Sequence, residues 1–238
     1  MDTTIRLDKY LANIGVCSRR AVDNLLEKNT VTINGKRVVK SGERLDPSTD
    51  ILYINGVKPK KAVLKYYLLN KPKGFISTTA DERSRKDVVS LIKTTERIYP
   101  VGRLDKDTTG LLILTNDGEL TNLLTHPRYH IAKTYRLTII GTVSQEQLDR
   151  IRKGMLLDDG QTSPAEVKVI NKNAKETILD MTIHEGRNRQ IRRMCEKVGL
   201  KLKELERIAI GTLRDPQLKV GHYRELSRTE IHTLNTIG

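Results

Sequence analysis

The spacing of apolar residues predicts two short helices near the N-terminal end of the chain. In segment 6–14 the apolar residues recur every three to four positions, as they do on one side of a helix. These residues are Leu7, Tyr10, Leu11 and Ile14. Gly15 then predicts a helix end, because glycine readily adopts the backbone conformation that closes a helix. We expect Ser18 to cap a second helix, whose apolar side carries Val22, Leu25 and Leu26.

A period of two residues replaces the helical period after residue 30. The segment 31–39 predicts two strands joined at Asn34-Gly35, a pair that favours the tight turn of a hairpin. A further strand is expected over residues 51–54. These elements predict a small module over residues 1–58, followed by a linker over residues 59–64 that contains Pro59 and Lys60.

Strand and helix patterns alternate in the remaining segment, residues 65–238, which we expect to form a second domain. Strand-like segments lie at 66–70, 111–114, 133–140, 166–170, 177–183 and 205–210. Capping boxes predict helices after Ser144 and Ser227, and another helix is expected after Asn116. Residues 188–198 predict a helix with one apolar side, formed by Ile191, Met194, Cys195 and Val198. The pattern indicates a mixed α+β fold.

Composition adds a strong positive charge to this outline. Among 238 residues, 43 are Lys or Arg and 29 are Asp or Glu, which gives a formal net charge of +14. Such an excess attracts polyanions, so nucleic acid is the favoured partner and a membrane surface is a weaker alternative. The sequence has no run of about 18 apolar residues and no apolar signal core, so we expect a cytoplasmic protein.

Basic residues are distributed over the two N-terminal helices and include Arg6, Lys9, Arg19 and Arg20. Two of them stand at a helix start, where free backbone N–H groups and the helix dipole favour a phosphate. This module resembles the S4 RNA-binding fold of ribosomal proteins, and the resemblance implies RNA contacts by these four residues. A solvated basic face on a purely structural module is the alternative interpretation.

A charged turn precedes the apolar segment 111–114. Asp105 lies between Arg103 and Lys106 within this turn. Cations close to a carboxylate favour its ionised form, as a nucleophile or a general base requires. From spacing alone, an Asp that caps or pairs within a turn is the simpler explanation.

The sequence around this turn resembles the signature of the pseudouridine synthases that act on ribosomal RNA, in the branch typified by small subunit synthase A and large subunit synthase B. The signature reads Gly-Arg-Leu-Asp, two free positions, Ser or Thr, one free position, Gly, then apolar residues and Thr, and here it spans residues 102–115. Further blocks match at 69–74, 115–118, 125–128, 133–135 and 185–194. The resemblance covers nearly the whole chain, and it implies a mixed, mainly antiparallel sheet as the floor of the active cleft.

The resemblance implies a role for three residues in the chemistry. Asp105 takes the place of the family's essential carboxylate, and Arg192 takes the place of the arginine that pairs with it, with Arg189 as the second choice. Tyr135 matches the family's tyrosine, which would stack on the flipped uracil. Without the motif, an ordinary core tyrosine would be the better interpretation of Tyr135.

Other cations in these blocks suggest contacts with RNA, and plain solvated side chains are the alternative. They are Arg103, Lys133, Arg187, Arg189 and Arg193. Ile191 is expected to form the apolar side of the uracil pocket. The family's reaction exchanges an N1–C1′ bond for a C5–C1′ bond without net addition, so no cofactor is implied. No metal is expected either, because His126 and His130 have no third ligand close in sequence.

The expected function is therefore the isomerisation of one uridine, flipped out of ribosomal RNA, to pseudouridine. The S4-like module and the blocks around Arg128 and Arg189 are most similar to the large-subunit branch. This resemblance predicts a target in the large-subunit (23S) RNA, with the small-subunit RNA as the alternative. A non-catalytic RNA-binding ribosome-assembly protein and an RNA methyltransferase are the rival hypotheses. The expected partner is ribosomal RNA, free or within an assembling particle, and we expect a monomer.

Overall fold

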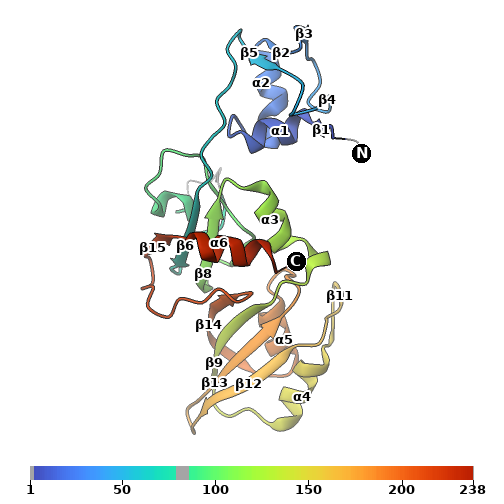
Figure 1. The fold of residues 1–238 in the computed structure, drawn as a ribbon. Coiled ribbons are helices and arrows are strands. Elements are labelled where there is room, and N and C mark those ends of the chain that lie inside the picture. The colour runs from blue at the N-terminus through green and yellow to red at the C-terminus, as the bar shows by residue number, and fades with distance from the viewer. Residues whose placement is uncertain (1–2, 79–85, 238) are drawn as a thin grey trace. The chain divides into compact units, whose positions relative to one another are not determined.

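The structure, a computed structural model, describes residues 3–78 and 86–237, whose contacts divide the chain into two compact units (Figure 1). The first unit consists mainly of the residues up to Lys65, and the second begins at Tyr66. The short segments Thr94–Arg97 and Asn116–Gly118 group with the first unit. Among the described residues, no helix combines the length and the apolar character that crossing a membrane would require.

The first unit contains two short helices and two small sheets. Its elements are β1 (Ile5–Arg6), α1 (Leu7–Asn13), the 3-10 turn η1 (Arg19–Ala21), α2 (Val22–Lys28), β2 (Val31–Ile33), β3 (Lys36–Arg37), β4 (Arg44–Leu45) and β5 (Leu52–Ile54). The sheets have the strand orders β3-β2-β5 and β1-β4. Leu7, Leu11 and Val22 are fully buried in the core between the helices and the strands.

The predicted hairpin is confirmed, because Asn34 and Gly35 both have positive φ, 51° and 79°, as a tight hairpin turn requires. The prediction for Ser18 is wrong in its detail. Ser18 does stand at a helix start, but that start belongs to η1, and the Ser18 side chain makes no capping hydrogen bond.

The second unit is built on one large sheet. Its strands are β6 (Tyr66–Lys71), β7 (Tyr99–Pro100), β8 (Thr109–Thr115), β9 (Lys133–Ile140), β12 (Glu166–Lys172), β13 (Glu176–Ile183), β14 (Lys201–Ile210) and β15 (Tyr223–Glu225). A separate hairpin is formed by β10 (Leu156–Leu157) and β11 (Gly160–Gln161). The helices are η2 (Val89–Leu91), α3 (Gly118–Thr125), η3 (Pro127–Tyr129), α4 (Gln145–Lys153), α5 (Gln190–Lys197) and α6 (Arg228–Asn235).

The large sheet has the order β12-β13-β9-β14-β8-β6-β15, with β7 paired to β8. All of these pairs are antiparallel except β8 with β14. The prediction of an α+β fold with a mixed, mainly antiparallel sheet is therefore confirmed. Strand β14 begins at Lys201, four residues before the predicted start at residue 205. The sequence did not indicate this first part of the strand, because Lys201, Lys203 and Glu204 are exposed and show no alternation of apolar residues.

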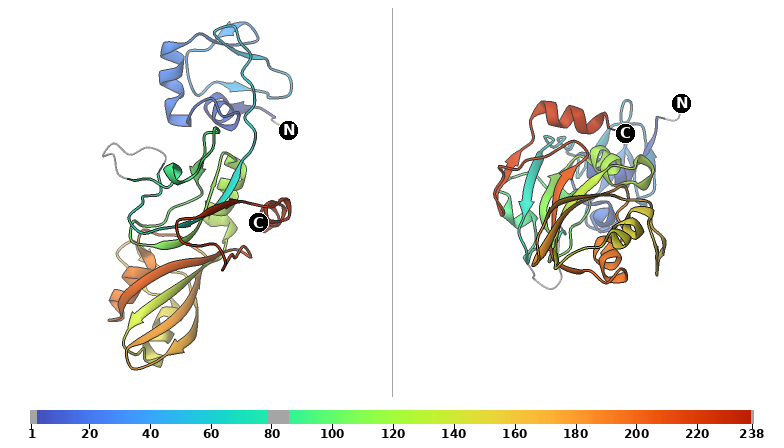
Figure 2. Two further views of the ribbon diagram at one scale, coloured as in Figure 1. Left: turned by 90° about the vertical axis from the view of Figure 1, so that its left-hand side faces the viewer. Right: turned by 90° about the horizontal axis from the view of Figure 1, so that it is seen from below.

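Alternating residues of the central strands face two separate cores. Leu69, Leu112 and Leu114 pack in the core that includes residues of α4 and α5. Leu68 and Ile113 belong to the other core, which includes residues of α3 and α6. The helices thus cover both faces of the sheet (Figure 2), and the predicted capping boxes at the starts of α4 and α6 are both present.

A buried ammonium group ties the turn that carries Asp105 to strand β6. Lys71, the last residue of β6, has no exposed surface. Its Nζ donates to the carbonyl oxygens of Asp105 (3.0 Å) and Thr108 (2.9 Å), and also to those of Pro72 (3.1 Å) and Lys106 (3.4 Å). Burial lowers the pKa of Lys71 to about 8, against the opposing effect of nearby Asp105 and Asp107. The backbone of the turn is therefore held by one interior cation.

Gly110 allows β8 to approach β14 closely. The two strands pair in parallel, with Gly110 opposite Arg207. A Cβ at residue 110 would lie 2.3 Å from the Arg207 carbonyl oxygen and 2.4 Å from its nitrogen, and the φ of Gly110 is +107°. Any side chain at this position would therefore force the two strands apart.

We predict that Gly110→Ala lowers the free energy of unfolding by at least about 3 kcal/mol, because backbone atoms cannot yield as a flexible side chain can. Gly141→Ala is the matched control, since Gly141 has a φ of +81° but no atom within 4 Å of an added Cβ. The control should lose only about 1–2 kcal/mol from its backbone conformation. Denaturant titration of both variants measures the difference, and equal losses would contradict the close-approach explanation.

Lys71→Met should change how stability depends on pH. The folded pKa of Lys71, about 8, lies below its ordinary value of 10.5, so the unfolded chain holds more protons between these two pH values. Raising the pH through this window should therefore stabilise the parent relative to Lys71→Met, by up to about 3 kcal/mol. Denaturant titrations from pH 7 to pH 10.5 test this, and a constant difference would show that Lys71 keeps an ordinary pKa.

Candidate active site

Asp105 lies in the turn between β7 and β8, and its side chain is 28% exposed. The turn closes with a hydrogen bond from the Thr108 N–H to the Asp105 carbonyl oxygen (3.1 Å). Two cavities, of about 390 and 80 Å³, share Asp105 and Tyr135 in their linings. The carboxylate therefore stands at the junction between a large and a small cavity.

Two arginines from the start of α5 approach this carboxylate. Arg192 Nε lies 3.8 Å and Arg189 Nη1 3.9 Å from Asp105 Oδ2, distances that suit ion pairs but exceed a hydrogen bond. Arg192 is anchored to the same turn, because its Nη2 donates to the Asp107 carbonyl oxygen (3.1 Å) and to Thr108 Oγ1 (3.2 Å). Its buried Nε has no hydrogen-bond partner among the described residues. That N–H is therefore available to the carboxylate after a small movement.

Tyr135 and Ile191 form walls of the smaller cavity. Tyr135 lies on β9 with 9% of its surface exposed, opposite Arg207 of β14. Ile191, on α5, is 4% exposed. The other apolar residues lining this cavity are Leu104, Ile183 and Leu205. The structure thus brings Asp105, Tyr135, Ile191 and Arg192 together around one cavity, although the sequence separates them widely.

Lysines and arginines outnumber the carboxylates Asp105 and Glu185 in the lining of the larger cavity. They are Arg103, Lys133, Arg187, Arg189 and Arg207. Lys133 Nζ donates to the Ile131 carbonyl oxygen (2.9 Å). Burial, together with the charge of Arg207, lowers the pKa of Lys133 to about 8. Arg103, by contrast, is exposed. The cavity therefore has both interior and surface cations.

Two of the lysines and arginines near Asp105 were missed by the sequence analysis. Lys71 has no exposed surface, and Arg207 is only 3% exposed. The available signal was a charged residue inside an apolar strand pattern, at the end of 66–71 and in the middle of 205–210. Such a residue has to find partners in the interior, which marks it as a candidate for a special role.

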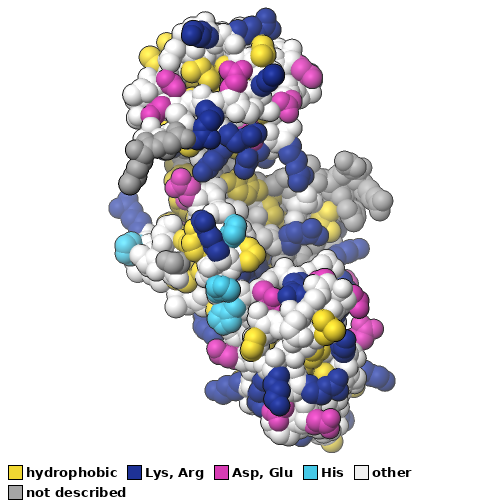
Figure 3. All heavy atoms as spheres, turned by 90° about the vertical axis from the view of Figure 1, so that its right-hand side faces the viewer, with side chains coloured by type: hydrophobic (Ala, Val, Ile, Leu, Met, Phe, Trp, Pro, Cys, Tyr) yellow, Lys and Arg dark blue, Asp and Glu magenta, His cyan; other side chains and the backbone are white. Residues whose placement is uncertain are grey.

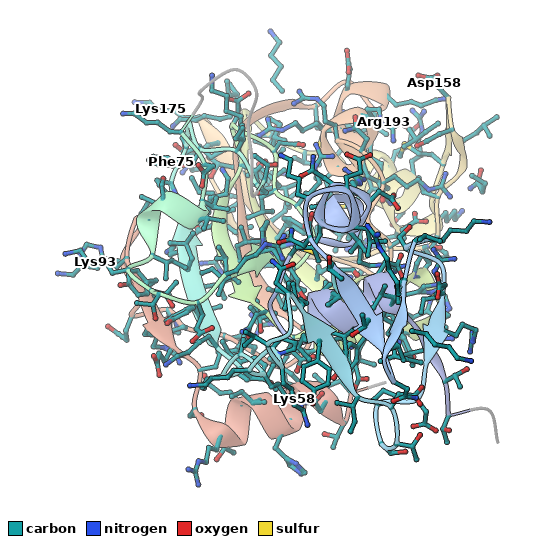
Figure 4. The ribbon with its side chains drawn as sticks, turned by 90° about the horizontal axis from the view of Figure 1, so that it is seen from above. Lys58, Phe75, Lys93, Asp158, Lys175 and Arg193 are labelled. Atoms are coloured by element: carbon teal, nitrogen blue, oxygen red, sulfur yellow. The ribbon has the colours of Figure 1, made fainter. Side chains whose placement is uncertain are left out.

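Arg187 and Arg193 differ from the predicted RNA contacts Arg6 and Arg19, because their engaged side chains are only about a quarter exposed. Arg193 donates from Nη1 and Nη2 to the two carboxylate oxygens of Asp159, each at 2.9 Å. Arg187 pairs with Glu185 (3.2 Å) and donates to the Gly160 carbonyl oxygen (3.0 Å). Arg193 is labelled in Figure 4, together with Asp158, which precedes Asp159 in the chain. These contacts attach the β10–β11 hairpin to α5.

The four predicted contacts of the first unit are largely exposed. Arg6 Nε and Arg19 Nη2 reach the carboxylate of buried Asp8, at 3.1 and 3.0 Å, while more than half of each arginine side chain stays exposed. Burial raises the pKa of Asp8, but hydrogen bonds from these arginines outweigh it, so the pKa is lowered. Lys9 and Arg20 are exposed beside them. Lys and Arg side chains are prominent on the face drawn in Figure 3.

His126 and His130 do not form part of a recognisable metal centre. Within residues 3–78 and 86–237, no group of three or more His, Cys, Asp or Glu side chains could hold an ion. His126 Nδ1 instead accepts a hydrogen bond from the Arg128 N–H (3.3 Å), and Arg128 lies over the ring of Tyr129.

Comparison with protein families gives two matches. The model described as RNA pseudouridylate synthase matches residues 65–197, which is more than half of the chain. The S4 domain model matches residues 5–51. The two matches do not overlap, and together they include the turn of Asp105, Tyr135 and the start of α5.

Known proteins resemble the chain over nearly its whole length. It is 42% identical to ribosomal large subunit pseudouridine synthase B of Bacillus subtilis (strain 168), over 98% of this chain and 96% of that protein. It is 39% identical to an uncharacterized RNA pseudouridine synthase of Aquifex aeolicus (strain VF5), over 97% of this chain and 93% of that one. A crystal structure of a pseudouridylate synthase has a TM-score of 0.71 at 30% identity, covering 97% of this chain and 99% of the other. The chain therefore belongs to the RNA pseudouridine synthase family of isomerases and carries an S4 domain at its N-terminal end.

Proposed function

We propose that this enzyme isomerises one specific uridine of large-subunit ribosomal RNA, with Asp105 as the catalytic carboxylate. The observation that carries the proposal is the position of Asp105, between two arginines and at the junction of two cavities that also share Tyr135. The choice of large-subunit RNA is supported by the 42% identity to a synthase named for that subunit.

Two arginines hold the Asp105 carboxylate in place. Arg189 and Arg192 both lie within ion-pair distance of it, and Arg192 also orients it, because its Nη2 is fixed to the turn. The reaction breaks the N1–C1′ bond, turns the freed base and joins C5 to C1′. The proton lost from C5 balances the proton gained at N1, so no cofactor is needed for the atoms to balance.

The smaller cavity is the proposed pocket for the flipped uracil. Tyr135 offers an aromatic face for stacking, and Ile191 with Leu205 supplies apolar walls. Flipping costs a few kcal/mol of lost stacking and pairing, which contacts in such a pocket have to offset. Asp105 lines both cavities, so a uracil in the smaller one would lie beside the carboxylate, with the larger one open to the sugar-phosphate backbone.

The proposed RNA contacts near the site are Arg103, Lys133 and Arg189, which line the larger cavity. In the first unit they are Arg6, Lys9, Arg19 and Arg20, where Asp8 orients two of the arginines without covering them. Arg187 and Arg193 are better explained as supports for the β10–β11 hairpin, because their guanidinium groups bind Glu185 and Asp159 and only about a quarter of each side chain is exposed. We further propose ribosomal RNA, free or in an assembling particle, as the substrate.

Chemical mapping of pseudouridine in ribosomal RNA tests the proposed substrate. Cells that lack the protein should lose one modification in the large-subunit RNA, and expression of the parent chain should restore it. Loss of a site in the small-subunit RNA instead would overturn the choice of subunit, while an unchanged map would remove ribosomal RNA as the substrate.

Asp105→Asn should abolish isomerisation but leave RNA affinity within a few-fold, since one charge contributes little to binding by a surface with a net charge of +14. Asp107→Asn is the matched control, because Asp107 lies in the same turn but is exposed, and it should retain activity. Single-turnover assays and RNA binding measure the two effects. Equal activity of Asp105→Asn and the parent would exclude Asp105 from the mechanism.

Replacing the two arginines separately tests which one orients the carboxylate. Arg192→Gln should lower kcat by about 100-fold, in the range seen when a fixed charged donor at a reacting group is lost. Arg189→Gln should lower it by about tenfold at most, because the Arg189 side chain is 49% exposed, against 18% for Arg192. A larger loss for Arg189→Gln would reverse the assignment.

A further inference from the structure

The larger cavity is lined by a buried arginine and a half-buried lysine, neither of which pairs with a carboxylate of the described residues. Lys133 of β9 and Arg207 of β14 both line it, and in the described part of the chain neither has an acidic side chain within ion-pair distance. The two strands are neighbours, with Arg207 opposite Tyr135. Since alternate residues of a strand share a face, Lys133 and Tyr135 lie on the same side of the sheet as this cavity.

Both side chains keep donors that the protein does not use. Arg207 is 3% exposed, and its Nε donates to the Leu111 carbonyl oxygen at 2.6 Å. Its buried Nη2 has no hydrogen-bond partner among the described residues. Lys133 Nζ donates to the Ile131 carbonyl oxygen, and an ammonium group has two further protons. An unused donor on a buried cation such as Arg207 is costly, so its presence at a cavity points to a ligand.

Electrostatics favour an anion over a neutral ligand at this place. Lys133 and Arg207 line the same cavity, so an anion placed there would be attracted by both positive charges. A uracil carbonyl oxygen would satisfy one donor but offset no charge. A phosphate diester offers two free oxygens and a negative charge, and the planar guanidinium group of arginine fits such oxygens well.

We propose that Lys133 and Arg207 form a subsite for a phosphate of the RNA backbone next to the flipped uridine. The identity of the ligand as RNA rests on the proposed function, whereas its anionic character rests on the cavity itself. Asp105 lines the same cavity, so a phosphate held there fixes the substrate backbone on the surface that also bears the carboxylate.

The subsite is rigidly linked to the catalytic turn. The backbone of Arg207 packs directly on Gly110, which lies five residues after Asp105. The side chain of Arg207 is also tied to Leu111 of the same strand. A phosphate bound to Arg207 is therefore located relative to the turn through two adjacent strands and not through a loop.

Titration of the full chain with inorganic phosphate tests the subsite directly. The guanidinium NMR signals of Arg207, identified by their loss in Arg207→Lys, should shift and saturate with a dissociation constant in the millimolar range. Uridine, which lacks phosphate, should not shift them at the same concentrations. Absence of a saturable shift with phosphate, or an equal shift with uridine, would overturn the proposal.

Lys133→Gln provides the second arm, because it removes one cation and leaves the bond from Arg207 to Leu111 in place. It should weaken phosphate binding about tenfold, the usual effect of losing one charged hydrogen bond. Lys168→Gln is the control, since Lys168 is exposed on β12 and does not line the cavity, and it should bind phosphate as the parent does. Equal affinities of Lys133→Gln and Lys168→Gln would also overturn the proposal.

Asp105→Asn separates this inference from the proposed function. The variant should still shift the Arg207 signals with phosphate, and bind it somewhat more tightly, because a nearby negative charge is removed. An inactive enzyme with an intact subsite would leave the phosphate proposal standing. An active enzyme on ribosomal RNA with no response to phosphate would refute the subsite alone.

Discussion

The geometry of the site depends on the buried ammonium group of Lys71. Three carbonyl oxygens of the segment that carries Asp105, together with that of Pro72, converge on this one cation, and no solvent reaches it. A neutral side chain of similar size would leave those carbonyl groups without partners in the interior, which is costly. The turn can therefore keep one conformation although it is irregular, and Arg192 then uses the same turn as its anchor.

The cations around this turn contact different groups. Lys71 holds the backbone of the turn, Arg189 and Arg192 face its carboxylate, and Lys133 with Arg207 faces the larger cavity. Cations outnumber carboxylates in this region, so the potential is positive before any substrate arrives. A bound polyanion neutralises the positive charge of these clustered side chains. The site therefore favours RNA over a neutral small molecule.

The sequence predicted the elements well where the apolar pattern was clear, as in β9 and in both capping boxes. It also named Asp105, Tyr135, Ile191 and Arg192, which the structure places around one cavity, but this came from family resemblance and not from periodicity. Lys71 and Arg207 were missed, because the residues next to them in sequence do not indicate which distant carbonyl oxygens they bind. The engagement of Arg193 by Asp159 was equally invisible, because it joins segments far apart in sequence.

The parallel pairing of β8 with β14 has a consequence for synthesis of the chain. Asp105 and β8 are made early, whereas α5 and β14, which bring Arg192 and Arg207, follow after β9, β12 and β13. Closing so long a loop costs entropy that only the finished sheet repays. A nascent chain thus has the carboxylate without its arginine partners, and the enzyme acquires its assembled centre only after translation has passed residue 210.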